Sequence, residues 1–77
     1  MNKFKLESFL NDEVIYLYQP EGAGTWGRIK FSRKNKKAEI MEKASNTNDN
    51  YDYKAIMMIQ ERCTNRTLPY EFIQAWG

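Results

Sequence analysis

Polar and apolar residues alternate through the first half of the chain, which is the period expected of β-strands. In the first stretch Phe4, Leu6 and Leu10 fall on one side of the alternation, and Phe9 is out of step. The second stretch, VIYLYQ, is rich in β-branched and aromatic residues, which favour strands. The pattern predicts four strands joined as an antiparallel meander, at residues 3–10, 14–19, 25–32 and 37–44.

The register of the last predicted hairpin follows from its side chains. With the turn centred on Lys34 and Asn35, the predicted pairs are Phe31–Ala38, Lys30–Glu39 and Ile29–Ile40. This register gives one apolar face and opposite charges across the strands, and both features stabilise a sheet.

A polar linker at residues 45–50 leads into a predicted helix at residues 51–63, with Asp49 or Asn50 as its N-cap. An apolar stripe at helical spacing suits this helix to cover one face of the sheet. The stripe consists of Ala55, Ile56, Ile59 and Cys63. Pro69 predicts a second, short helix over the segment YEFIQAW, capped by Thr67 or Leu68.

These elements predict the α+β fold class. The expected architecture is a four-stranded antiparallel β-meander packed against one α-helix, with a short C-terminal helical segment. A chain of 77 residues has room for one domain, which we expect to span residues 1–77.

The pairing of strand 14–19 with strand 25–32 decides which side chains face outward. A register with Ile15 opposite Ile29 also sets Tyr18 opposite Trp26. It predicts a core face made of Leu6, Ile15, Leu17, Ile29, Phe31, Ala38 and Ile40. The opposite face then forms a candidate binding face of Tyr16, Tyr18, Trp26, Arg28, Lys30 and Met41.

Aromatic rings interleaved with basic residues suit two kinds of ligand. Rings can stack on the bases of single-stranded nucleic acid while cations meet its phosphates. The same residue types are enriched at protein interfaces. Two structural explanations remain open beside these: the C-terminal segment can cover this face as a second small core, or the rings can simply shield their strands.

The positive charge is concentrated in one part of the chain. Residues 28–43 carry seven basic and two acidic residues, a balance of +5, and the remainder carries five basic and eight acidic residues, a balance of −3. The predicted hairpin tip holds the basic residues Arg33, Lys34, Lys36 and Lys37. This basic hairpin suits contact with phosphate or with an acidic partner, and the alternative is a solvated turn that discourages strand pairing.

The sequence offers few groups for catalysis. Histidine is absent, and Cys63 is the only cysteine and lies on the apolar helix stripe. We therefore expect no enzymatic activity, no cofactor and no metal site. A lone cysteine fits a reducing compartment, so we expect a cytoplasmic protein without membrane association.

The leading hypothesis is a non-enzymatic protein-interaction module. It would bind a protein partner through the binding face and the basic hairpin, as in a phage or mobile-element accessory protein of the inhibitor or immunity type. The alternatives are a small basic protein that binds single-stranded nucleic acid, and a homo-oligomeric structural protein.

Overall fold

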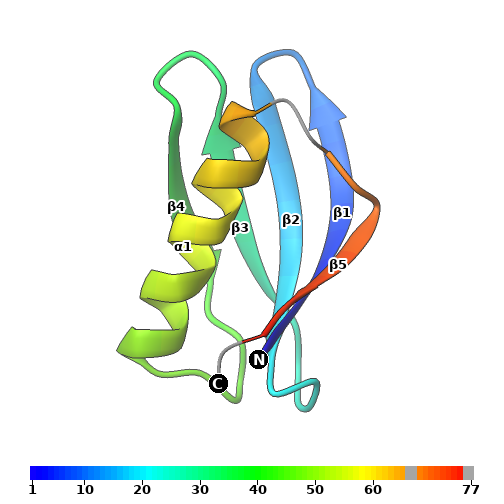
Figure 1. The fold of residues 1–77 in the computed structure, drawn as a ribbon, viewed down its shortest axis with the longest axis vertical. Helices are drawn as coiled ribbons and strands as arrows, with labels where there is room; N and C mark the ends of the chain where they lie inside the picture. Colours follow the sequence, from blue (N-terminus) through cyan, green and yellow to red (C-terminus); the bar gives the residue numbers. More distant parts are fainter. Residues whose placement is uncertain (66–67, 76–77) are drawn as a thin grey trace.

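The computed structural model describes residues 1–65 and 68–75. A five-stranded antiparallel sheet with strand order β4-β3-β2-β1-β5 has one helix packed on one face (Figure 1). The elements are β1 (Asn2–Leu10), β2 (Glu13–Pro20), β3 (Gly27–Ser32), β4 (Lys37–Glu42), α1 (Asp49–Thr64) and β5 (Glu71–Gln74). The α+β class, the four predicted strands and the long helix are thus confirmed.

The predicted register of the β3–β4 hairpin is also confirmed. Phe31 pairs with Ala38 and Lys30 pairs with Glu39. A β-bulge follows between Arg28 and Ile29, where β4 carries one extra residue.

α1 begins two residues before the predicted start. Its N-cap is Asn48 rather than Asp49 or Asn50, because the Asn48 side-chain oxygen accepts a hydrogen bond from the Tyr51 N–H at 2.9 Å. Among the described residues, no helix combines the length and the apolar character needed to cross a membrane.

The predicted C-terminal helix is wrong, because residues 71–74 form β5 at the edge of the sheet. Phe72 stacks on Phe4 with ring centroids 4.6 Å apart and meets Tyr16 edge-on at 5.6 Å. Gln74 accepts a hydrogen bond from the buried Asn2 side chain and donates one to the Lys54 carbonyl of α1. These contacts come from segments far away in sequence, and together they outweigh the local helical pattern. Thr67 and Trp76 lie outside the described residues.

The predicted register between β2 and β3 is wrong by one residue. Tyr16, not Ile15, lies opposite Ile29, and Tyr18 lies opposite Gly27. Because successive side chains of a strand alternate between faces, this shift turns Tyr16 and Tyr18 toward α1. Both tyrosines are fully buried, and Ile15 and Leu17 are half-buried on the opposite face.

Gly27 gives the physical reason for this register. A Cβ atom at Gly27 would overlap the Tyr18 ring and the backbone of Glu42 and Ala44, so glycine lets the ring lie directly against β3. The Tyr18 hydroxyl donates to Asp52 of α1 at 2.9 Å and accepts from the Ala44 N–H at 3.2 Å. The buried tyrosine therefore connects the sheet, the linker and the helix.

The core lies between this face of the sheet and α1. Its buried apolar members come from β1, β2, β3, the linker and α1: Phe4, Val14, Tyr16, Tyr18, Ile29, Phe31, Ala44, Ala55, Ile59 and Cys63. Asp52 is also buried, where it accepts hydrogen bonds from Tyr18 and Thr47 and pairs with Lys43 at 3.3 Å. Its charge is therefore compensated within the fold.

Replacing Gly27 by alanine tests this packing. The added methyl group must displace the Tyr18 ring or the β4 backbone, so the Gly27→Ala protein should lose about 1–3 kcal/mol of unfolding free energy. Urea denaturation followed by circular dichroism measures the loss. An unchanged midpoint would mean that Gly27 does not contact Tyr18 as described.

Candidate functional site

The structure separates the six residues of the predicted binding face. Tyr16 and Tyr18 are excluded from any surface, because they are buried beneath α1. Trp26 and Met41 remain partly exposed. Arg28 and Lys30 lie on the face of the sheet that α1 leaves open, and each is paired with two carboxylates.

Arg28 is clamped between two glutamates on the open face. Its guanidinium donates two hydrogen bonds to the Glu7 carboxylate, at 2.9 and 3.0 Å, and a third to Glu42 at 2.8 Å. These hydrogen bonds, that to Glu7 first, raise the pKa of Arg28, and the same pairing lowers the pKa of the Glu7 carboxyl. With its fork of donors directed at Glu7 and Glu42, Arg28 is a poor candidate for binding phosphate.

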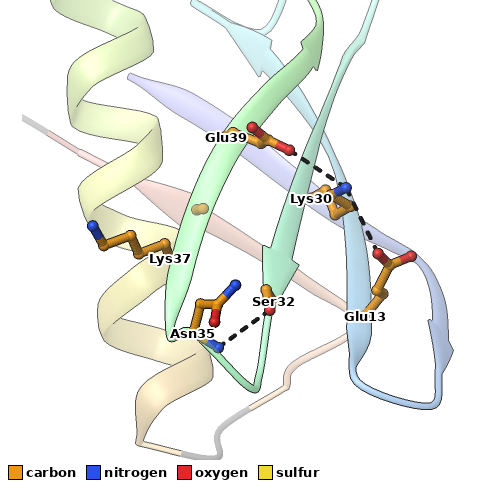
Figure 2. A pocket seen from close by; sticks show the side chains of 7 residues that line it. Glu13, Lys30, Ser32, Asn35, Lys37 and Glu39 are labelled. Carbon is orange, nitrogen blue, oxygen red and sulfur yellow. Dashed lines mark hydrogen bonds and ion pairs between the residues drawn. The ribbon is translucent and has the colours of Figure 1, made fainter.

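Lys30 is paired in the same way. Its amino group lies between the Glu39 carboxylate at 3.4 Å and the Glu13 carboxylate at 3.6 Å (Figure 2). These residues line an open hollow of about 670 Å³. Hydrogen bonding to Glu39 is the main cause of its raised pKa. Lys37 also lines the hollow, but its side chain extends away from this pair of carboxylates. The middle of the open face is therefore a network of internal ion pairs.

Trp26 lies over a separate hollow on the open face. This hollow measures about 340 Å³ and is lined also by Lys3, Lys5, Glu71 and Ile73. The amino group of Lys5 also lies over the Tyr70 ring, 5.8 Å from the ring centroid. The Trp26 ring thus adjoins the outer edge of the sheet rather than the paired Arg28 and Lys30.

A third surface is formed where the β1–β2 and β3–β4 turns lie side by side at one end of the molecule (Figure 1). The Arg33 N–H donates to the Asp12 carbonyl at 2.7 Å and links the two turns. We call this surface the double-hairpin end. It comprises Phe9, Leu10, Arg33, Lys34, Lys36 and Lys37, all of which are exposed.

Two apolar side chains stand among the cations of the double-hairpin end. Leu10 is 71% exposed and Phe9 is 44% exposed. The Arg33 guanidinium lies 4.8 Å from the centroid of the Phe9 ring, in cation–π contact. In the described part of the chain, none of the four basic residues here forms an ion pair.

Phe9 and Leu10 were not among the predicted site residues, and Leu10 was expected on the same side as Phe4. A bulge between Leu6 and Ser8 shifts the register of β1 before its end. The sequence carries one signal of their exposure: Asn11 and Asp12 turn the chain directly after Leu10, which places Leu10 at a hairpin tip where no helix covers it.

Cys63 faces the core and is 6% exposed. Burial raises the pKa of its thiol to about 11, so the thiol is protonated at neutral pH and is a weak nucleophile. Among residues 1–65 and 68–75, no cluster of three potential metal ligands is found.

Comparisons with protein-family models, with curated proteins and with solved structures give no match.

Two buried groups predict a loss of stability at alkaline pH. Burial raises the pKa of Tyr16 to about 12, and that of Cys63 to about 11, above their ordinary values. The folded protein holds these protons more tightly than the unfolded chain, so the stability they contribute is complete below pH 9 and is lost as the pH rises through 11 and 12.

The variant Tyr16→Phe tests this dependence. It should show a smaller drop in unfolding free energy between about pH 8 and pH 11.5, by roughly 1–2 kcal/mol. Urea titrations at both pH values measure the drop, and Tyr53→Phe is the matched control because Tyr53 is exposed. Equal drops in wild type and Tyr16→Phe would contradict the assignment.

Proposed function

We propose that the protein is a non-enzymatic protein-interaction module that binds an acidic, partly apolar surface of a partner protein with its double-hairpin end. The observation that carries this proposal is the pair Phe9 and Leu10, exposed among four cations that form no ion pair within the described residues.

The distribution of ion pairs favours this end over the open face. Among the described residues, seven of the ten carboxylates take part in ion pairs, and four of these seven hold Arg28 and Lys30. Binding an anion at the open face would require breaking those pairs. The cations of the double-hairpin end carry no such cost, and a cluster of like charges accelerates encounter with an acidic partner.

The apolar side chains of the double-hairpin end can supply binding affinity that its charges alone do not. Exposed ion pairs contribute little affinity, whereas burying a leucine or phenylalanine side chain contributes about 1.5–3 kcal/mol. Phe9 and Leu10 are thus suited to act as anchors, and the surrounding cations orient them.

The shape of this end limits the kind of partner. Two turns project at one end of the longest axis of the molecule, so the surface is narrow and protruding (Figure 1). A stable interface buries about 800 Å² per partner, which a protruding end reaches best by entering a concave site. An inhibitor or immunity-type accessory protein that plugs an acidic cleft, as phages and mobile elements encode, is the role that this geometry supports best.

The nucleic-acid hypothesis has less support. It relied on stacking by Tyr16, Tyr18 and Trp26, and only Trp26 is accessible. Its phosphate contacts now rest on the basic hairpin, since Arg28 and Lys30 are paired. We therefore treat nucleic-acid binding as an outcome that the experiment must distinguish.

Variants of the double-hairpin end test the proposal. Immobilised wild-type protein is used to capture a partner from nuclease-treated lysate of the source cells, and the captured protein is purified for titration. We expect Leu10→Ser, and separately the triple variant Lys34→Glu, Lys36→Glu, Lys37→Glu, to weaken its binding at least about tenfold, equivalent to about 1.4 kcal/mol. The control is Met57→Ser, which removes an apolar side chain exposed on α1 and should leave binding unchanged.

Two results would contradict the proposal. The first is a partner that both variants of the double-hairpin end bind as tightly as wild type does. The second is micromolar binding of labelled single-stranded RNA or DNA that survives at about 200 mM salt, which would establish the nucleic-acid alternative.

A further inference from the structure

The two edges of the sheet differ in how they are protected from pairing with another strand. At β4 the outward Ala38 N–H donates to the Gln60 side chain of α1 at 3.0 Å. Lys37 begins this strand, and a bulge near Met41 distorts its far end. Capping, lysine and a bulge are all devices that discourage pairing at an edge. β5 consists of Glu71, Phe72, Ile73 and Gln74 and has none of these three features, so its edge is protected only by its short length and by the charge of Glu71.

The hydrogen bonds of β5 show which of its backbone groups point away from β1. The Leu6 N–H donates to the Tyr70 carbonyl at 2.7 Å, so Tyr70 directs its backbone toward β1. In an antiparallel ladder this orientation alternates, and Phe72 therefore also points its backbone groups at β1. The N–H and C=O groups of Glu71 and Ile73 point away from the sheet. They form a short row of donors and acceptors along the outer edge.

The side chains beside this row are largely exposed. Ile73 is 55% exposed and Tyr70 is 62% exposed. On the open face, Lys3 lies next to Ile73 and Lys5 lies next to Glu71, so two lysines flank one carboxylate. Lys3 forms no ion pair with any residue in the described ranges.

We propose that β5 pairs antiparallel with β5 of a second copy of the chain, about a two-fold axis that passes beside Phe72. In this arrangement Glu71 of each copy lies opposite Ile73 of the other, and the four outward groups of each strand find partners. The two sheets become one continuous antiparallel sheet. This surface is separate from the double-hairpin end, so the proposal does not rest on the proposed function.

Side-chain chemistry favours this register over one centred on Glu71. A two-fold axis beside Glu71 would set the two Glu71 carboxylates directly opposite each other, which is destabilising. With the axis beside Phe72, each Glu71 lies instead against the aliphatic Ile73 of the other copy. Lys3 is then two strands from that Glu71, roughly 10 Å between strand axes, a distance that the two long side chains can span. The second copy thus supplies the carboxylate that Lys3 lacks.

Four residues give a small interface, so we expect a weak dimer that forms only at high protein concentration. Analytical ultracentrifugation from about 10 µM to 1 mM should show a rising dimer fraction. Ile73→Lys should raise the dissociation constant at least about tenfold. The matched control is Met41→Lys on the other edge strand, where Met41 is 52% exposed, and it should leave the constant unchanged. Thermal melts verify that both variants fold.

Hydrogen exchange identifies the contact itself. The amides of Glu71 and Ile73 should exchange freely in dilute protein and become protected as the dimer forms. A protein that stays monomeric at about 1 mM would overturn the proposal. So would a dimer that persists in Ile73→Lys, or one in which those two amides gain no protection.

Discussion

The close approach of Tyr18 to Gly27 is the constraint on which the rest of the structure depends. The ring occupies the space that a Cβ atom would fill, and its hydroxyl reaches Asp52 of α1 and the Ala44 N–H. These contacts fix the register of β2 against β3. Because a strand alternates its side chains between faces, they also turn Tyr16 toward α1, where its hydroxyl donates to the Pro69 carbonyl at 2.7 Å. The register that this packing contact sets thereby joins α1, the linker and the segment before β5 to the centre of the sheet.

This register decides which groups remain for recognition. Once the tyrosines are inside, the open face keeps Arg28 and Lys30 beside the glutamates that neutralise them. Four basic residues that form no ion pair within the described part of the chain then lie with Phe9 and Leu10 at the double-hairpin end. The interaction surface that we propose is therefore a consequence of internal packing. On the face predicted to bind a partner, the basic side chains are held in ion pairs within the protein.

The sequence predicted the β3–β4 hairpin because its pattern was unambiguous: apolar residues alternate with Lys30 and Glu39, whose charges are opposite. β2 carries apolar residues on both faces, so alternation could not choose between Ile15 and Tyr16. The choice depends on partners 34 and 53 residues away, Asp52 and Pro69. β5 was not predicted because it also depends on a contact between distant parts of the chain, the stacking of Phe72 on Phe4. Of the candidate site, the basic hairpin was predicted, and the anchors Phe9 and Leu10 were not.

The most direct test of this account is a two-dimensional NMR measurement of contacts between Hα atoms across β2 and β3. Residues in non-hydrogen-bonded antiparallel pairs bring their Cα atoms to about 4.5 Å and give strong Hα–Hα cross-peaks. The structure makes Leu17 and Arg28 such a pair. The pairs on either side of it, Tyr16–Ile29 and Tyr18–Gly27, are the ones that exchange backbone hydrogen bonds between β2 and β3. A strong cross-peak between Leu17 and Arg28 is the predicted result. A cross-peak between Tyr16 and Arg28 in its place would return the tyrosines to the open face and contradict the account.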